Sequence, residues 1–80
     1  MDSTQILEEV DEIFKDELDN DDIVIQRDTT AGDIAEWDSL THITLVVAIE
    51  KHFKVKFTAA EIQGFKNVGE MCDAIHAKVS

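Results

Sequence analysis

A serine at the predicted start of a helix is the residue in this chain best suited to carry a chemical group. The chain reads Glu36-Trp37-Asp38-Ser39-Leu40 at this point. Asp38 is a good N-cap, because its short side chain can accept hydrogen bonds from the free N–H groups of the first turn. Ser39 then lies at the positive end of the helix macrodipole, where free amides favour an anion. This position suits a hydroxyl that carries a phosphate ester.

Asp38, Ser39 and His42 also supply the residue types of a hydrolase triad. Their spacing argues against catalysis. Three residues within one helical turn cannot place an orienting carboxylate behind a histidine that faces the serine. The chain also has no Gly-x-Ser-x-Gly motif, which would expose a nucleophilic serine on a sharp turn. We therefore expect no enzymatic activity from this set.

The other candidate residues do not indicate a metal-binding site. The three histidines, His42, His52 and His76, lack the spacing of metal ligands. Cys72 lies in an apolar stripe, which is typical of a buried small side chain and not of a reactive thiol. The acidic run at residues 19–22 lacks the glycine and the terminal glutamate of a calcium loop. We expect a solvated turn there, and weak binding of a divalent cation by its carboxylates stays open.

The chain resembles the acyl carrier protein family in its motif Asp38-Ser39-Leu40, in the run Leu45-Val46-Val47-Ala48-Ile49-Glu50 and in Phe53. The resemblance covers nearly the whole chain, in length, helix spacing and loop positions. In that family the serine of the motif is esterified with 4′-phosphopantetheine from coenzyme A, whose thiol carries acyl groups as thioesters. The resemblance implies that Ser39 is the attachment site and that Asp38 and Leu40 flank the prosthetic group.

The resemblance also implies the partners. A phosphopantetheinyl transferase would load Ser39, and acyl-activating, acyl-transferring or synthase enzymes of a lipid or secondary-metabolite pathway would use the carrier. Carriers of fatty acid synthesis typically have acids after the motif, which engage basic patches on enzymes. The corresponding positions here are Thr41, Thr44, Lys51 and His52, followed by Lys54 and Lys56.

The residues before the motif also differ from the fatty acid carriers. Trp37 is more typical of specialised carriers, including D-alanyl and secondary-metabolite types, while Asp38 argues against a peptidyl carrier, which usually has histidine there. We therefore expect a carrier dedicated to one pathway. Two alternatives stay open. One is a D-alanyl or aminoacyl carrier, and the other is a non-catalytic interaction module of the same fold without the prosthetic group.

Composition predicts one small helical domain over residues 1–80. The chain is 44% hydrophobic and contains no proline and only three glycines, which favours long helices. Strand-like alternation is brief. We predict an all-α four-helix bundle with a long loop between the first two helices and a short third helix. One cysteine excludes an internal disulfide, and no signal peptide or long apolar run is visible, so we expect a cytoplasmic protein.

The formal net charge of −11 is unevenly distributed along the chain. Residues 1–38 hold fourteen of the 18 acids against two bases, a net of −12, and residues 39–80 hold four acids and five lysines, a net of +1. An acidic protein is a poor partner for nucleic acid or anionic membranes. We expect a monomer that binds other proteins, without nucleic acid and without membrane insertion.

Apolar spacing and capping residues predict the helix positions. Asp2 or Ser3 begins the first helix, the second covers about residues 39–53, Thr58-Ala59-Ala60-Glu61 opens a short third helix that ends near Gly64, and Asn67 opens the last. Apolar residues in the long connection are expected to pin it across the bundle; they are Ile23, Val24, Ile25, Ile34 and Trp37.

A helical wheel of residues 39–53 predicts which side chains are buried. The buried side holds Ile43, Val46, Ile49 and Phe53. Glu50 falls within this arc, so its carboxylate needs hydrogen-bond donors, and we expect the amides from Thr58 to Glu61 to supply them. Leu45 lies towards the far side and Val47 at the edge. Both either contact partner enzymes or complete the packing as partly exposed side chains. We expect partner contacts for them, together with Lys51 and Lys54 on the flank of the same helix.

Overall fold

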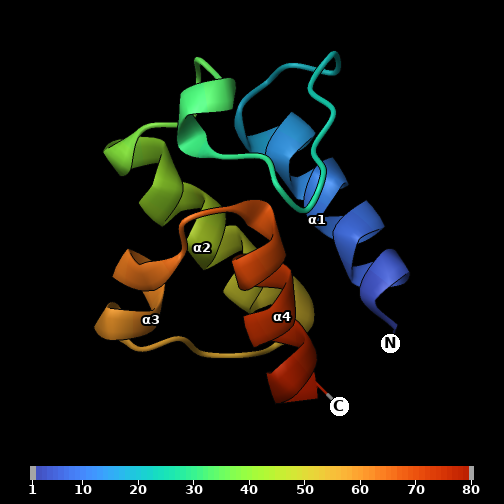
Figure 1. Cartoon of the computed structure of the whole chain (residues 1–80), viewed down its shortest axis with the longest axis vertical. Helices are drawn as coiled ribbons and strands as arrows, with labels where there is room; N and C mark the ends of the chain where they lie inside the picture. Colours follow the sequence, from blue (N-terminus) through green and yellow to red (C-terminus); the bar gives the residue numbers. More distant parts are fainter. Residues whose placement is uncertain (1, 80) are drawn as a thin grey trace.

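Four α-helices build the protein, and no strand lies among residues 2–79, the part of the chain that this computed structural model describes (Figure 1). The helices are α1 (Ser3–Glu17), α2 (Ser39–Phe53), α3 (Ala59–Gly64) and α4 (Val68–Val79), with a short 3₁₀ turn, η1 (Ala31–Asp33), before α2. The long helix α1 packs against both α2 and α4. The predicted all-α fold is confirmed, with its long first loop and its short third helix.

Side-chain caps set the helix starts at the predicted positions. Asp2 caps α1, Asp38 caps α2 and Thr58 caps α3, each by accepting a hydrogen bond from a backbone N–H of the first turn. Before α4, Asn67 Oδ1 accepts a hydrogen bond from the N–H of Glu70 at 2.9 Å. These bonds are local in the sequence, which is why the sequence alone located the starts.

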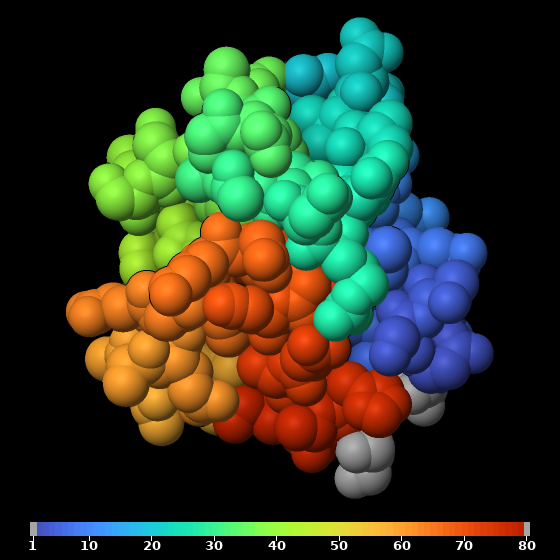
Figure 2. All heavy atoms as spheres, viewed as in Figure 1, coloured from blue at the N-terminus to red at the C-terminus, as the bar shows by residue number. Residues whose placement is uncertain are grey.

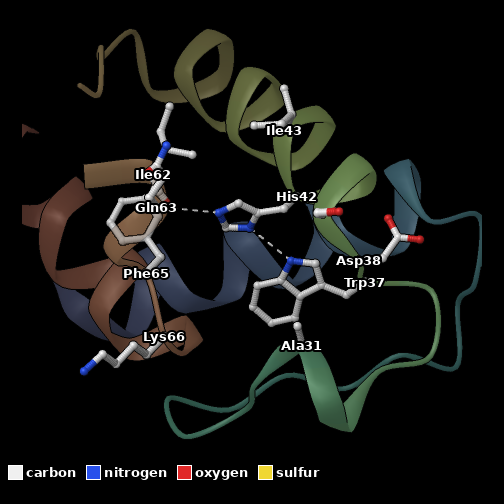
Figure 3. A pocket seen from close by; sticks show the side chains of 10 residues that line it. Ala31, Trp37, Asp38, His42, Ile43, Ile62, Gln63, Phe65 and Lys66 are labelled. Carbon is white, nitrogen blue, oxygen red and sulfur yellow. Dashed lines mark hydrogen bonds between the residues drawn. The ribbon is translucent and has the colours of Figure 1, made fainter. Parts of the chain in front are cut away.

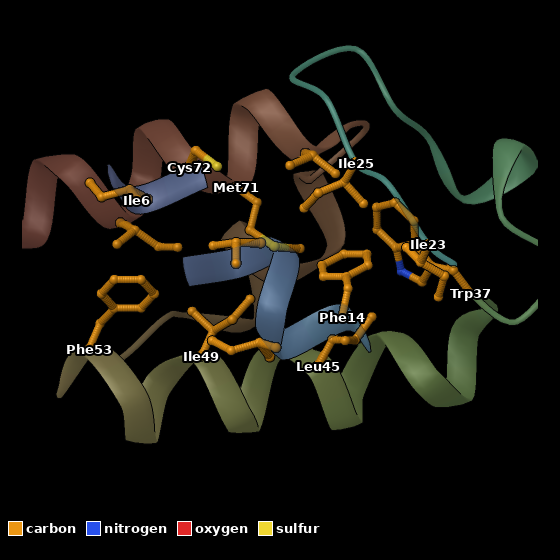
Figure 4. Close-up of a cluster of buried hydrophobic side chains, with 14 of the residues drawn as sticks. Ile6, Phe14, Ile23, Ile25, Trp37, Leu45, Ile49, Phe53, Met71 and Cys72 are labelled. Carbon is orange, nitrogen blue, oxygen red and sulfur yellow. The ribbon is translucent and has the colours of Figure 1, made fainter. Parts of the chain in front are cut away.

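The core lies where α1, α2 and α4 meet (Figure 4). The largest side chains buried completely are Phe14, Ile6, Leu45, Ile49, Met71 and Ile75. In Figure 4, Leu45, Ile49 and Phe53 point from α2 towards the other two long helices. Each of α1 and α4 faces the core with one apolar side, and α2 buries Val46, Ile49 and Phe53 as expected, with Leu45 in place of Ile43.

The helical-wheel prediction for α2 was wrong about the burial of two residues. Leu45 is completely buried, so it cannot contact a partner, and Ile43 is 51% exposed although we expected it in the core. The physical reason is that α2 is apolar around most of its circumference, so its sequence does not say which arc faces the core. The packing of α1 and α4 selects the arc of Leu45, Val46, Ile49 and Phe53. Val47 is partly exposed at the edge, as expected.

The long loop of residues 18–38 is packed against the helices. Ile23, Ile25, Ile34 and Trp37 are buried, as predicted, but Val24 is 72% exposed. Successive side chains of an extended segment point to opposite sides, so burying Ile23 and Ile25 leaves Val24 in solvent. Figure 2 shows this loop in teal and green, bordering the orange start of α4.

The loop also supplies hydrogen-bond acceptors for the first backbone amides of α4, through contacts that the sequence did not indicate. The carbonyl of Arg27 accepts a hydrogen bond from the N–H of Gly69 at 2.7 Å, and the carbonyl of Thr29 accepts one from Val68 at 2.9 Å. Two free amides of the first helical turn thus find partners. The approach is so close that a Cβ added to Gly69 would lie 2.8 Å from the Arg27 oxygen. Gly69 is therefore required by the space between loop and helix.

We predict that Gly69→Ala lowers the free energy of unfolding by about 1–3 kcal/mol, because the loop backbone must move away from the new methyl group. Gly64→Ala is the matched control, since nothing lies within 4 Å of its added Cβ. The control should stay within about 1 kcal/mol of the wild type. Urea unfolding followed by circular dichroism measures both. Equal losses in the two variants would contradict the close approach.

Glu50 fixes the connector that follows α2. Its Oε2 accepts a hydrogen bond from the N–H of Phe57 at 2.8 Å. The expected role of Glu50 as an acceptor is confirmed, but the donor precedes the expected range by one residue. The reason is that Thr58 and Glu61 cap each other: the Thr58 N–H donates to Glu61 Oε1 at 2.9 Å, and the Glu61 N–H donates to Thr58 Oγ1 at 3.1 Å.

Replacing Glu50 by alanine should lower the free energy of unfolding by about 1–3 kcal/mol, the effect of leaving the Phe57 amide without its acceptor. Glu50→Gln keeps an acceptor oxygen and should recover most of the loss. Glu12→Ala, at an exposed position on α1, removes the same charge from the acidic chain and serves as the control. Denaturant curves that do not separate Glu50→Ala from this control would show that the hydrogen bond has no energetic role.

Candidate functional site

Ser39 is the first residue of α2, and it is exposed. Asp38 beside it accepts hydrogen bonds from the N–H groups of Leu40 and Thr41, at 3.0 and 2.9 Å. These bonds, chiefly the one from Thr41, hold the pKa of Asp38 below its ordinary value of 3.8. Asp38 therefore stays ionised at neutral pH and keeps the start of the helix in place.

Thr41 completes the cap from the other side. Its Oγ1 accepts a hydrogen bond from the Asp38 N–H at 2.7 Å and donates one to the carbonyl of Glu36 at 2.8 Å. The backbone on both sides of Ser39 is thus fixed by Asp38 and Thr41. Among residues 2–79, no hydrogen bond uses the Ser39 hydroxyl, so this hydroxyl has no part in capping.

A pocket of about 390 Å³ lies beside Ser39 (Figure 3). It lies between η1, the start of α2 and the segment that contains α3, and its lining residues are Ala31, Trp37, Asp38, Ser39, His42, Ile43, Ile62, Gln63, Phe65 and Lys66. Most of this lining is aromatic or aliphatic. A space of this kind can shelter an apolar group near Ser39 from water.

His42 links α2 to Trp37 on one side of the pocket and to α3 on the other. The Trp37 Nε1–H donates to His42 Nδ1 at 3.1 Å, and His42 Nε2 lies 3.0 Å from the carbonyl oxygen of Ile62 (Figure 3). An indole N–H can only donate, so Nδ1 is the acceptor. The partners therefore assign the proton to Nε2, which donates to Ile62. The ring of Phe65 meets the His42 ring edge-on, with centroids 6.4 Å apart.

The sequence did not predict this hydrogen-bonded bridge from Trp37 through His42 to Ile62. From the sequence, His42 was a candidate only for a catalytic base or a metal ligand. The spacing of Trp37 and His42 across the helix start was the one available signal, and the third partner, Ile62, lies twenty residues further along. Both ring nitrogens of His42 are engaged away from Ser39. The structure thus agrees with the expectation that Asp38, Ser39 and His42 do not form a hydrolase triad.

His42→Ala is predicted to lower the free energy of unfolding by about 1–3 kcal/mol, because the Trp37 N–H and the Ile62 carbonyl lose their partner. The emission of Trp37, the only tryptophan, should shift to longer wavelength as the indole becomes more exposed. His76→Ala is the control, since no hydrogen bond among residues 2–79 uses the His76 side chain. An unchanged emission maximum in His42→Ala would contradict the bridge.

The structure separates the predicted site residues into three places. Asp38 and Ser39 lie together at the helix start, and Leu40 is 77% exposed next to them. Val47 lies on the exposed side of α2, and Lys51 and Lys54 are exposed at the other end of that helix. Leu45 lies in the core, as described above. Ile43, which we expected to be buried, joins the exposed group.

The remaining candidates add no second site within residues 2–79. No three histidine, cysteine, aspartate or glutamate side chains in this range are grouped to hold a metal ion. Within the same range, no helix is long and apolar enough to cross a membrane. Cys72 is buried in the core, as predicted, and burial raises the pKa of its thiol to about 11.

Comparisons with known proteins agree with this geometry. Residues 4–75 match the family described as phosphopantetheine attachment site. The chain is 30% identical over 80 residues to an acyl carrier protein of Thermosynechococcus vestitus, covering 100% of this chain and 99% of the relative. It is also 43% identical to a holo acyl carrier protein from Geobacter metallireducens, solved by solution NMR. That likeness has a TM-score of 0.87 and covers 92% of this chain and 85% of the other.

The fold, the capped helix start and the family match together define a phosphopantetheine-binding carrier. The chain belongs to the acyl carrier protein family. It is a non-catalytic carrier that holds acyl groups on a phosphopantetheine arm and interacts with the enzymes of a pathway. The predicted family, cofactor and class of function are thus confirmed. The match favours this function over an interaction module that lacks the prosthetic group.

Proposed function

We propose that Ser39 carries the phosphopantetheine and that the chain serves a pathway of its own in lipid or secondary metabolism. The observation that supports Ser39 most strongly is the division of roles at the helix start. Asp38 and Thr41 form the cap, while the exposed Ser39 hydroxyl makes no hydrogen bond among residues 2–79. A group esterified there extends into solvent without breaking an interaction of the fold.

The surroundings of Ser39 fit a phosphate ester. The N-terminus of α2 is the positive end of the helix macrodipole and favours an anionic group. The bound phosphopantetheine supplies a thiol that holds acyl groups as thioesters. The protein keeps the attachment point rigid through Asp38 and Thr41, and the apolar pocket beside Ser39 can cover a short acyl group. Tethering raises the effective concentration of that group at each docked enzyme.

The partners follow from this role. A phosphopantetheinyl transferase must recognise the helix start and transfer phosphopantetheine from coenzyme A to Ser39. Acyl-activating, acyl-transferring or synthase enzymes must then bind the loaded protein. The exposed Lys51 and Lys54 on α2 support a dedicated pathway, because like charges would face them on an enzyme with a basic docking patch.

The chain offers a matched control for the attachment site. Ser3 is also the first residue of a helix and also follows a capping aspartate, Asp2. We predict that the wild type and Ser3→Ala gain one phosphopantetheine when incubated with coenzyme A and a broad-specificity transferase. Ser39→Ala should gain none and should unfold at the same denaturant concentration as the wild type, because the Ser39 hydroxyl makes no hydrogen bond among residues 2–79.

Intact mass spectrometry measures the modification, and circular dichroism checks the fold of each variant. Phosphopantetheine on folded Ser39→Ala would disprove the assignment, as would its absence from both the wild type and Ser3→Ala. The outcome shows whether modification requires the motif and its pocket, or only a serine that follows a capping aspartate.

A further inference from the structure

Three aromatic rings separate the pocket beside Ser39 from the hydrophobic core. The middle ring is that of His42. It is nearly parallel to the Trp37 indole, with centroids 6.0 Å and planes 24° apart, and it meets the Phe65 ring edge-on. All three residues line the pocket. Figure 3 shows the His42 ring spanning the space between Trp37 and Ile62. We call Trp37, His42 and Phe65 the ring barrier.

The core begins directly behind the ring barrier. Trp37 packs edge-on against the completely buried Phe14, at one end of the core (Figure 4). Leu45 and Val46 follow His42 by three and four residues on α2, so they lie on the same side of the helix, one turn further along. Both are buried. A hydrocarbon chain that passed His42 from the pocket would therefore enter the core.

Hydrogen bonds hold the ring barrier closed. The indole N–H of Trp37, a residue that is only 4% exposed, donates to His42 Nδ1, and His42 Nε2 donates to the Ile62 carbonyl. If the His42 ring moved aside, the indole N–H would lose its acceptor within the protein interior, which is costly. An apolar side chain at this position would leave no such group unpaired. The barrier therefore resists a chain that pushes against it.

The space in front of the ring barrier is short. Ser39 and His42 are three residues apart, which corresponds to about 4.5 Å along the helix axis. This distance equals about three carbon–carbon bonds of roughly 1.5 Å each. The pocket also extends across to Ile62 and Gln63 on the opposite side. Together these dimensions leave room for an acyl chain of about four to six carbons.

We propose that the ring barrier restricts this carrier to short acyl groups, because it stops the tail of the chain at His42. The tail enters the pocket first, since the thioester ties the other end to the arm. A chain of about four to six carbons then draws its thioester against the protein. A longer chain meets the barrier and leaves its thioester in water. This inference deepens the proposed function and rests on it, because the arm is attached to Ser39.

The test compares thioesters of different length on the same full-length protein. A broad-specificity phosphopantetheinyl transferase loads the chain from butyryl-, hexanoyl-, decanoyl- or dodecanoyl-coenzyme A. Hydroxylamine then takes the acyl group and frees the thiol, and intact mass spectrometry follows the loss. The same acyl group on free pantetheine gives the unprotected rate.

In the wild type, the hexanoyl thioester should be cleaved about fourfold or more slowly than its pantetheine reference, which is the effect of burying one methylene group. The decanoyl and dodecanoyl thioesters should be cleaved at close to their reference rates, because the barrier keeps them outside the pocket.

Two variants separate the ring barrier from general stability. His42→Ala removes the middle ring and should slow cleavage of the decanoyl thioester by about fourfold or more. A purely structural role of His42 would instead reduce the protection of every chain length. Glu50→Ala is also expected to destabilise the domain, but Glu50 does not line the pocket. This control should keep the wild-type order of protection.

A third variant keeps the proposal testable if His42→Ala does not fold. Trp37→Phe retains an aromatic ring next to Phe14 but removes the N–H that holds His42 in place. It should also slow cleavage of the decanoyl thioester, because the His42 ring can then move aside without leaving an indole N–H unpaired.

The failures of the two proposals are distinguishable. A wild-type protein that gains no acyl-phosphopantetheine contradicts the attachment at Ser39 before any rate is measured. A loaded wild type that protects decanoyl as well as hexanoyl, or protects neither, overturns the ring barrier and leaves the attachment intact. Unchanged cleavage of the decanoyl thioester in folded His42→Ala, or in Trp37→Phe, also overturns it.

Discussion

The structure depends on a short transition from core to surface between Trp37 and Ser39. Trp37 is buried against Phe14, with ring centroids 5.0 Å apart, whereas Ser39 two residues later is exposed. The extended backbone of Asp38 spans this step, and its carboxylate binds the first amides of α2. Because the Trp37 indole is anchored in the core, the Asp38 cap is held beside the pocket. The same contact thus secures the long loop and presents the serine.

The other side of the site is held less firmly. The short α3 has no buried residue, so its position depends on a few contacts made by the helix and by the residues on either side of it. These contacts are the His42 bond to Ile62, the edge-on pair of Phe57 and Phe65, and Lys78, which pairs with Glu61 and lies over the Phe57 ring. Elements with little buried apolar surface open at lower free energy than the core. The pocket therefore has one firmly packed wall, formed by α2, and one wall around α3 that is held by fewer buried contacts.

The sequence was sufficient for features that depend on neighbouring residues. Asp38 and Thr58 located helix starts, because a cap and its amides lie within three residues of each other. The sequence also indicated which side of α1 and of α4 is buried, because each of these helices has one apolar side. In α2 the sequence was insufficient: Leu45 and Ile43 are equally apolar, and only the packing of the other helices decides between them. Most of the fold, and the position of Ser39, could thus be predicted.

Features that join distant parts of the chain could not be predicted in this way. The carbonyl of Arg27 at the amide of Gly69 joins residues that are far apart in sequence, and no pattern near either residue indicates the contact. The link from His42 to Ile62 is of the same kind. Both contacts depend on how the loop and α3 lie on the finished bundle, which is a property of the whole fold.

The burial of Cys72 limits the side chains to which an acyl group on the prosthetic thiol can transfer. A thioester exchanges readily with any thiolate that can reach it, and the thiolate is the reactive form of cysteine. With the Cys72 thiol in the core and its pKa raised to about 11, the protein itself offers no competing sulfur near neutral pH. Cargo on the prosthetic thiol therefore meets no accessible cysteine thiolate of the polypeptide to which it could transfer.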